Sequence, residues 1–474
     1  MANREELSPL SILQAQRDAF LADDFPSAKT RIDRIDRVRD IHVRYKRQIV
    51  EALEADFGSR PQGQSLATDV LSTIIEVKET RSKIQRWMKP ERRKTPLLMW
   101  LTGGRAELQF QPLGVVGNIS PWNFPVGLAF HPTVGALAAG NRVMLKPSEL
   151  APRTSQLIRE MVESAFDTTE LAVVTGGVEE ARAFSQLPFD HLIYTGGPDV
   201  ARAVMRSAAD SLVPLTLELG GKCPVVVGRS ADIRLVADRV MGTKTLNSGQ
   251  LCLTPDYVLL PEGAVETFID EAFKVLAKCY ASLADNPEHT AVINERHWCR
   301  LKGYIDDLEL RKTRVEVFNP AKETFDCPKT HKLPFSFPID PDDDALVMQD
   351  EIFGPILSLK SYRSLDEAID FINRKPRPLA LYYFGKDKQE IEALCQRTTS
   401  GGLTINDCAQ HATIPDLPLA GVGNSGMGAY HGRHGFLQFS HSKAVYRQGM
   451  LSMGKLMRPP YGRRKVKLME SLIR

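Results

Sequence analysis

The sequence predicts an α/β fold with two domains, each built on a mostly parallel sheet, and a small segment that bridges them. From residue 106 onward, short runs of β-branched residues alternate with helical stretches, which is typical of strands joined by crossover helices. This alternation starts again near Cys223. The chain has 474 residues, more than one hydrophobic core usually covers, so more than one domain is expected.

The first hundred residues are polar and periodic. Residues 10–21, 28–57 and 65–87 each have the apolar spacing of an amphipathic helix. Prolines and a glycine pair interrupt the pattern between residues 90 and 104. We therefore expect three helices before the first sheet begins.

Five further segments define the two alternations. In the first, residues 114–117 predict a strand and residues 155–166 a helix. In the second, residues 224–227 and 256–260 predict buried strands, and residues 232–245 a helix between them. Both series indicate parallel strands with crossover helices.

Composition and charge exclude several classes of protein. Hydrophobic residues make up 43% and charged residues 25% of the chain, which are ordinary globular values, and a net charge of +3 is too small to indicate a nucleic-acid partner. No apolar run approaches the ~18 residues that span a bilayer. The amino terminus lacks the apolar core of a signal peptide, and the seven cysteines form no closely spaced pair. We therefore expect a cytoplasmic protein without an integral membrane segment.

The carboxy-terminal tail is strongly basic and also contains leucine and methionine. Its cations are Lys455, Arg458, Arg463, Arg464, Lys465, Lys467 and Arg474. This composition fits a helix that docks on a membrane surface or a partner. It also fits the more common alternative, a solvated tail packed on the body of the protein.

Cys252 lies in the segment NSGQLCLTPD, between Gly-Gln and Thr-Pro, at a polar bend before a strand. Such a bend exposes the sulfur, and a thiol with a lowered pKa or a neighbouring base can attack a carbonyl. The alternative is a buried cysteine that acts as a small hydrophobic residue. By itself, this segment leaves both interpretations open.

Glu218 lies between two leucines, and two glycines follow the second leucine. Partial desolvation at a strand end would raise the pKa of its carboxyl group and make it a base near neutral pH. A buried carboxylate paired with Lys222 is the alternative.

Asn123 lies in the stiff turn SPWNFP, where two prolines could hold its amide as a donor to a developing oxyanion. An asparagine that only satisfies the turn is the alternative. In the strand end MLKPSE, Glu149 could bind ribose hydroxyls and Lys146 a ribose or a phosphate.

Gly196 and Gly197 follow a buried strand and precede a helix with proline at its first position, which is a weak signal for a pyrophosphate site. Glu351 and Phe353, in QDEIFGP, suit a ribose contact and a ring wall, although a plain turn fits equally well. The ten histidines have no metal-ligand spacing, so we expect no metal site.

Taken together and in this order, the segments resemble the aldehyde dehydrogenase superfamily along essentially the whole chain. The motifs are PWNFP, KPSE, TGG before a helix, LELGGK, GQLC and EIFGP. KPSEL and the segment GVGNSGMGAYHGRHGFLQFSHSK look like the class 3 branch, and the tail LMRPPYG is similar to that of bacterial enzymes acting on coniferyl aldehyde.

The resemblance implies a role for each of these residues. Cys252 would be the nucleophile, Glu218 the general base, and Asn123 with the backbone N–H of Cys252 the oxyanion hole. The cofactor, NAD with NADP as an alternative, would be bound by Lys146, Glu149, Gly196, Gly197, Ala201, Glu351 and Phe353. The substrate would be an aromatic aldehyde, such as coniferyl aldehyde, or a medium-chain aliphatic one.

The resemblance also implies a domain division and an assembly. A Rossmann-like NAD(P)-binding domain would comprise residues 1–90 and 107–216, a catalytic domain 217–405, a bridging or oligomerisation segment 91–106 and 406–440, and a tail 441–474. Relatives of class 3 are usually dimers, so a homodimer is expected.

Two departures from the family pattern concern binding. The usual glycine-serine-threonine turn is Gly196-Gly197-Pro198 here, with Ala201 as its closing residue, which affects the phosphate contacts. Where many relatives have Pro-Phe-Gly-Gly, this chain has residues 418–421, Pro-Leu-Ala-Gly, which could alter the substrate entrance.

Two other functions compete with this hypothesis. An acylating enzyme would transfer the acyl group to coenzyme A and would not need Glu218 as a base. A non-catalytic protein of the same fold would have no reason to combine Cys252, Glu218 and Asn123.

Overall fold

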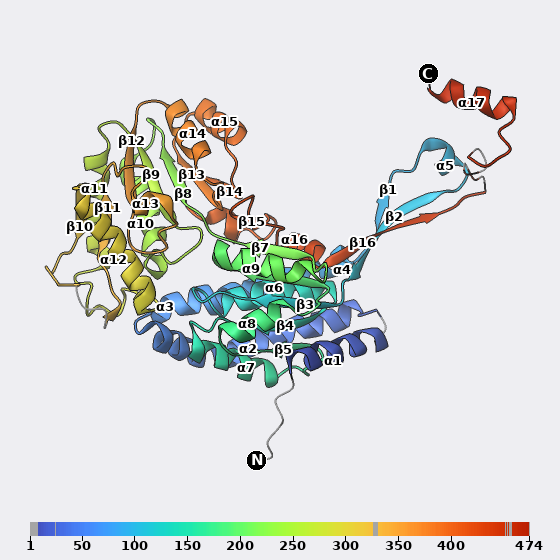
Figure 1. Ribbon diagram of the computed structural model, residues 1–474, viewed down its shortest axis with the longest axis horizontal. Coiled ribbons are helices and arrows are strands. Elements are labelled where there is room, and N and C mark those ends of the chain that lie inside the picture. The colour runs from blue at the N-terminus through green and yellow to red at the C-terminus, as the bar shows by residue number, and fades with distance from the viewer. Residues whose placement is uncertain are drawn as a thin grey trace, which may run out of the picture.

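The computed structural model describes residues 8–23, 25–325, 330–450, 452, 454 and 457–473. Two lobes, each built on a parallel sheet, lie against each other, and a long extension leaves the molecule on one side (Figure 1). The predicted α/β fold with two parallel-sheet units is therefore confirmed. Lys455, Arg474 and part of the tail motif LMRPPYG lie outside the described residues.

The first lobe contains a six-stranded sheet in the order β15-β7-β6-β3-β4-β5. Its strands are β3 (Val115–Ile119), β4 (Arg142–Lys146), β5 (Leu171–Val173), β6 (His191–Thr195), β7 (Leu215–Glu218) and β15 (Gly426–Met427). All neighbours pair in parallel except β15, which is antiparallel to β7. The chain moves outward from β3 to β5 and then returns to the other side at β6. The carboxyl ends of β3 and β6 therefore form a switch point, where open α/β sheets bind ligands.

Helices cover both faces of this sheet. They are α1 (Pro9–Ala22), α2 (Ala28–Phe57), α3 (Gln62–Ser65), α4 (Ser72–Trp87), α6 (Gly127–Ala139), α7 (Pro152–Glu163), α8 (Val178–Ser185), α9 (Pro198–Ala209) and α16 (Gly432–Gln438). Ser27 begins α2 by accepting a hydrogen bond from the Thr30 N–H, and Gly58, at φ 75°, ends it. The expectation of one continuous α-helix over 65–87 is wrong in one respect, because a π-helical turn, Leu66–Leu71, separates α3 from α4.

The second lobe contains a five-stranded parallel sheet in the order β12-β9-β8-β13-β14. Its strands are β8 (Cys223–Val227), β9 (Pro255–Pro261), β12 (Ser358–Tyr362), β13 (Ala380–Phe384) and β14 (Gly402–Ile405). Every residue of β8 and β9 is buried, as expected when helices cover both faces of a sheet. The strands predicted over 224–227 and 256–260 are therefore confirmed.

The helices of the second lobe surround this sheet. They are α10 (Ile233–Thr245), α11 (Val265–Cys279), α12 (Glu295–Leu310), α13 (Leu346–Gln349), α14 (Leu365–Arg374) and α15 (Lys388–Arg397), and a hairpin of β10 (Val315–Phe318) and β11 (Phe335–Pro338) adjoins them. The helix predicted over 232–245 is α10, which Asp232 caps by accepting from the Arg234 N–H at 3.0 Å.

The extension is a three-stranded antiparallel sheet, β1-β2-β16, with the short helix α5 at its far end. Its elements are β1 (Glu91–Arg93), α5 (Leu97–Leu101), β2 (Arg105–Pro112) and β16 (Ser440–Arg447), and the last helix of the chain, α17 (Arg463–Ile473), follows β16. β16 pairs with β2 along its whole length. We expected residues 107–112 in the first domain and residues 441–447 in the tail. Both ranges instead belong to the sheet of the extension, together with β1 from the expected bridging segment.

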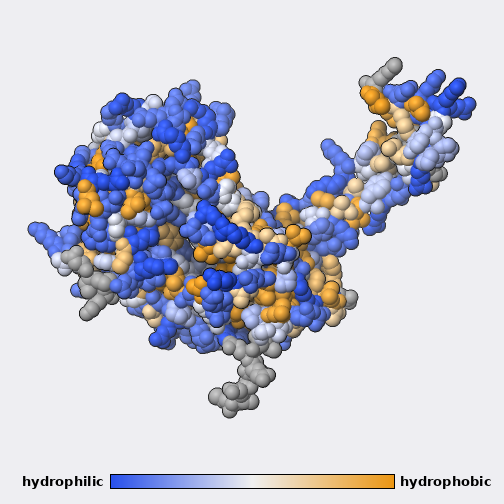
Figure 2. All heavy atoms as spheres, viewed as in Figure 1, coloured by the Kyte–Doolittle hydropathy of each residue, from blue (hydrophilic) through white to orange (hydrophobic). Residues whose placement is uncertain are grey.

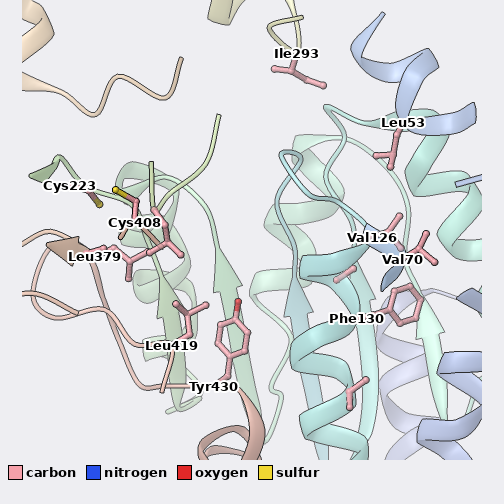
Figure 3. Close-up of a cluster of buried hydrophobic side chains, with 14 of the residues drawn as sticks. Leu53, Val70, Val126, Phe130, Cys223, Ile293, Leu379, Cys408, Leu419 and Tyr430 are labelled. Atoms are coloured by element: carbon pink, nitrogen blue, oxygen red, sulfur yellow. The ribbon is translucent and has the colours of Figure 1, made fainter. Parts of the chain in front are cut away.

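One hydrophobic cluster reaches from one lobe into the other. Figure 3 shows Val126 and Phe130 of the first lobe opposite Cys223 and Leu379 of the second, and all four belong to the same buried cluster. The loops between the two sheets are therefore fixed by packing from both sides. Within the described part of the chain, no helix is long and apolar enough to cross a membrane.

Candidate active site

The first lobe brings most of the singled-out residues to one edge of its sheet. Lys146 and Glu218 are the last residues of β4 and β7, Gly196 directly follows β6, and Asn123 lies in the turn after β3. These strands are parallel, so their carboxyl ends lie along the same edge, at the switch point between β3 and β6.

The second lobe supplies the loops that precede its strands. Cys252 lies just before β9, and Glu351 and Phe353 lie in the loop before β12. The backbone at Gly249, in the first loop, lies against the carbonyl of Gly354 in the second so closely that a Cβ atom at Gly249 would be 2.4 Å from that oxygen. The carboxyl edge of one sheet thus faces the two loops at the amino edge of the other.

The bend before Cys252 is built from left-handed backbone. Asn247, Ser248 and Gly249 have φ angles of 53°, 51° and 73°, an arrangement that costs energy for the two residues other than glycine. Gln250 holds the bend, because its side-chain amide donates to the carbonyls of Asn247 and Ala291, each at 3.0 Å. The predicted polar bend with a partly accessible cysteine is confirmed.

The thiol of Cys252 is neutral in this environment. Burial, together with the nearby carboxylates Glu351 and Glu218, raises its pKa to about 12, and hydrogen bonds from the backbone N–H groups of Cys252 and Leu253 offset only part of this effect. The thiolate therefore requires a base or additional positive charge before it can act as a nucleophile.

Glu218 is only 4% exposed, and neither of its carboxylate oxygens has a hydrogen-bond partner among the described residues. Burial alone raises its pKa well above the ordinary value. The alternative of an ion pair with Lys222 is wrong. Lys222 bonds instead to the Asp256 carboxylate and to the carbonyls of Val347 and Asp350, at 2.7 and 2.8 Å.

Asn123 is buried and lies next to the loop of Cys252. Its side-chain amide donates to the carbonyl of Gln250 at 3.2 Å. Its own carbonyl accepts from Asn247 at 3.1 Å and from the guanidinium of Arg60 at 2.7 Å. The turn of Asn123 and the bend before Cys252 are thus connected directly.

A buried ion pair fixes this turn from behind. Arg60 and Asp69 have no exposed side-chain surface, and their nitrogen and oxygen are 2.7 Å apart. The other oxygen of Asp69 accepts from the N–H groups of Val126 and Gly127, at 3.1 Å each, where α6 starts. The pair therefore joins the π-helical turn to Asn123 itself and to the chain three and four residues after it.

A shallow pocket lies where Glu149 was expected to contact a ribose. Glu149 and residues of α7 and of the loop after β5 line it, namely Pro152, Ser155, Gln156, Thr175 and Gly176. Lys146 is beside it but buried, and its ammonium donates to the carbonyls of Pro147 and Gly176 at 3.0 and 2.9 Å. The ammonium group of Lys146 therefore already makes two hydrogen bonds within the protein.

The glycine turn after β6 leads directly into α9. Gly197 is the N-cap and Pro198 the first residue of that helix, as the sequence predicted. Ala201 is 1% exposed and packs in the core below the turn. Since its side chain faces the core, Ala201 supports the glycine turn by packing beneath it.

Glu351 lies between the two lobes and approaches the glycine pair after Glu218. A Cβ atom at Gly220 would be 2.1 Å from a Glu351 carboxylate oxygen, so any larger residue there would displace this carboxylate. The other carboxylate oxygen is buried without a partner, and burial raises the pKa of Glu351 to about 8. Phe353, at φ 49°, packs edge to face on Trp122 at 5.3 Å.

Sequence reasoning missed the residues that hold these loops. Arg60, Asp69 and Asp256 were not singled out, and Lys222 was considered only as a partner of Glu218. Asp69 gave a weak signal, as an acid within an apolar helical pattern. The described residues contain no group of three or more potential ligands that could hold a metal ion.

The fold and the site together define an α/β protein in which the switch point of a dinucleotide-type sheet faces a cysteine between two carboxylates. Comparison with known proteins agrees with this class. The profile of the aldehyde dehydrogenase family matches residues 11–445. The chain belongs to this family and is an oxidoreductase that acts on aldehydes, as its motifs predicted.

Three relatives illustrate the similarity. A probable coniferyl aldehyde dehydrogenase of Caulobacter vibrioides is 49% identical over 95% of this chain and 94% of its own length. The coniferyl aldehyde dehydrogenase of a Pseudomonas species is 47% identical over 95% and 93%. The substrate-bound structure of AldH from Staphylococcus aureus is 32% identical, with a TM-score of 0.90 over 98% of this chain and 99% of that one.

The Asp69 carboxylate provides a direct test of the ion pair behind Asn123. Asp69→Asn should lower the free energy of unfolding by about 3–5 kcal/mol, because it leaves the buried Arg60 charge without a counter-charge. Asp33→Asn, which removes a surface partner of Arg37, should cost less than about 1 kcal/mol. Urea denaturation of both variants measures the difference in the free energy of unfolding. Equal losses in the two variants would show that the buried pair stabilises the fold no more than the surface pair does.

Proposed function

We propose that this enzyme oxidises an aldehyde to a carboxylic acid with NAD, through a thioester on Cys252 that Glu218 helps to hydrolyse. The observation that carries the proposal is the buried Glu218 carboxylate, which has no partner and lies close enough to Cys252 to raise the pKa of its thiol. A buried acid without a structural partner is costly, and such groups are concentrated at functional sites.

The first half of the reaction uses the thiol and fixed donors. The Sγ of Cys252 gives its proton to a solvent water and forms a bond to the aldehyde carbon, and the carbonyl electron pair moves to oxygen. The Asn123 amide and the backbone N–H of Cys252 then stabilise the alkoxide. Bound NAD would supply the acceptor for the hydride of this tetrahedral adduct, and loss of the hydride would leave a thioester on Cys252.

Glu218 is suited to the second half of the reaction. Its raised pKa lets it take a proton from water near neutral pH. The resulting hydroxide attacks the thioester carbon and the Cys252 sulfur leaves, so the carboxylic acid is released. An acylating enzyme that uses coenzyme A would not need this base, and the burial of Glu218 favours hydrolysis.

Several features of the first lobe fit a dinucleotide. The N–H groups at the start of α9 suit a pyrophosphate, and Glu149 is exposed at the mouth of a pocket that an adenine ribose would fit. The unpartnered oxygen of Glu351 suits a hydroxyl of the nicotinamide ribose. An aldehyde dehydrogenase of Mycobacterium tuberculosis with the same fold, 24% identical with a TM-score of 0.82 over 94% of this chain and 90% of that one, was solved with NAD+.

We further propose that the first lobe binds the cofactor, that the second carries the nucleophile, and that the enzyme is a cytoplasmic homodimer. The substrate class rests on the relatives that act on coniferyl aldehyde by name and cover nearly the whole chain. We therefore place aromatic aldehydes first and medium-chain aliphatic aldehydes second.

Removing the base should separate the two halves of the reaction. Glu218→Gln keeps the size of the side chain but cannot accept a proton, so NADH should form once per site and then stop almost completely. General-base assistance typically contributes ~10²–10⁴-fold, so the later phase should be slower by about that factor. Stopped-flow absorbance measures the burst, and mass spectrometry should find the acyl group on the Cys252 peptide. Cys252→Ala is the matched control, with no burst but with NAD still bound; steady turnover in Glu218→Gln would remove Glu218 from the mechanism.

The choice of cofactor should depend on Glu149. Its carboxylate would repel the 2′-phosphate of NADP, so the wild type should prefer NAD and Glu149→Gln should narrow the preference. The ratio of kcat/KM for the two cofactors tests this. A wild type with a tenfold preference for NADP would contradict the assignment.

Substrate class is tested with a panel of aldehydes. Coniferyl aldehyde should have the highest kcat/KM, followed by hexanal, with glycolaldehyde and betaine aldehyde well below both. Running the panel with and without coenzyme A also checks for acyl transfer. Higher kcat/KM for the small polar aldehydes would contradict the proposed substrate class.

A further inference from the structure

Cys252 lies in a β-turn whose central peptide is not held by the turn itself. The N–H of Thr254 donates to the Leu251 carbonyl at 2.9 Å and closes the turn. Cys252 and Leu253 are therefore its two central residues, and the peptide between them takes no part in the closing hydrogen bond. Leu253 disfavours a full rotation of this peptide, which would need a positive φ there, but smaller rotations are limited by contacts outside the turn.

Cys223 makes such a contact with the central peptide. Its thiol donates to the Cys252 carbonyl at 3.3 Å. Cys223 is the first residue of β8 and has no exposed surface. Figure 2 shows that hydrophilic side chains cover most of the second lobe, so this thiol lies below the surface that meets water. Solvent therefore does not compete with the Cys252 carbonyl for the thiol proton.

The position and the protonation of the Cys223 thiol are both fixed. The neighbouring residue, Lys222, is anchored by the Asp256 carboxylate and by two backbone carbonyls, which holds the chain at the start of β8. Burial, together with the charge of Glu351, raises the pKa of Cys223 well above its ordinary value. The thiol therefore keeps its proton and remains a donor at neutral pH.

The opposite end of the same peptide faces the nucleophile. The carbonyl of Cys252 and the N–H of Leu253 belong to one planar peptide unit and point in opposite directions. The N–H of Leu253 is one of the two backbone groups that lower the pKa of the Cys252 thiol. A donor on the carbonyl therefore fixes the direction of this N–H. It also polarises the peptide, which strengthens the hydrogen bond from the N–H to the sulfur.

A second side chain holds the next carbonyl of the turn in a similar way. The hydroxyl of Tyr382, on β13, donates to the Leu253 carbonyl. β13 and β8 are paired neighbours in the sheet of the second lobe. Two adjacent strands of this sheet therefore each supply one donor to the turn that carries Cys252.

We propose that Cys223 is a positioning residue for the reaction of Cys252, whose thiol holds the central peptide of the turn so that the N–H of Leu253 faces the nucleophilic sulfur and stabilises its thiolate. The inference rests on the proposed function, which assigns the nucleophile to Cys252. Since a hydroxyl donates as a thiol does, serine should replace Cys223, whereas alanine should not.

The pH dependence of alkylation tests the proposal without the aldehyde reaction. Iodoacetamide reacts with the thiolate, and mass spectrometry of the Cys252 peptide gives the rate at this sulfur over neutral to alkaline pH. Cys223→Ala should raise the apparent pKa of Cys252 by roughly 0.5–1 and lower the rate at a given pH about three- to tenfold, because one hydrogen bond contributes on this scale. Cys223→Ser should react at least as fast as the wild type. The matched control, Cys408→Ala, removes another buried thiol and should leave the rate unchanged.

The serine variant separates hydrogen bonding from packing. Equal rates in the wild type and Cys223→Ala would overturn the proposal, and so would a rate in Cys223→Ser as low as in Cys223→Ala. If circular dichroism shows that Cys223→Ala does not fold, Cys223→Ser decides alone, because a hydroxyl is the stronger donor and a rate below the wild type would contradict its role. Aldehyde turnover by Cys252→Ala would refute the proposed reaction instead, whatever the alkylation rates.

Discussion

The arrangement of the candidate active site depends on the buried ion pair of Arg60 and Asp69. Neither side chain reaches solvent, so both charges have lost their hydration and are stabilised by each other, by backbone groups and by the Thr68 hydroxyl, which donates to Asp69 at 2.8 Å. Arg60 donates to the Asn123 carbonyl, and Asp69 accepts from the chain at the start of α6. Because an unpaired charge here would be very costly, the turn of Asn123 has little freedom to move. The π-helical turn supplies Asp69, and such turns are frequent at functional sites.

A second buried ion pair, between Lys222 and Asp256, holds the loops of the second lobe. Lys222 and Asp256 are nearly inaccessible to solvent, and their remaining hydrogen bonds go to backbone groups of residues 347–352. This holds Glu351 against the Gly220 backbone, while Gly249 fixes the distance between that loop and the bend of Cys252. One of these ion pairs lies in each lobe, and a single hydrophobic cluster includes buried residues of both lobes.

The carboxyl group of Glu218 differs from the charged groups of these two ion pairs, which have partners of opposite charge. It is as buried as they are but has no partner in the described structure, so the fold contains an unsatisfied polar group that it could have avoided with an apolar residue. The desolvation that makes the group unfavourable also raises its pKa and that of the Cys252 thiol. We interpret the unsatisfied Glu218 carboxyl group as a loss of folding stability that makes this residue more reactive. The base and the nucleophile lie together where the two lobes meet.

Local pattern in the sequence was sufficient for much of the fold. The spacing of apolar residues predicted α2 with both of its ends and α10 to within one residue, and β-branched runs predicted β8 and β9, because these signals depend only on near neighbours. The order of the motifs also identified the family. Tertiary structure alone decided that Lys222 pairs with Asp256 instead of Glu218, that Asp69 reaches Asn123 through Arg60, and that β16 completes the sheet of β2. Each of these contacts joins residues far apart in the chain, and a charge or an edge strand in a sequence does not specify which distant partner it will meet.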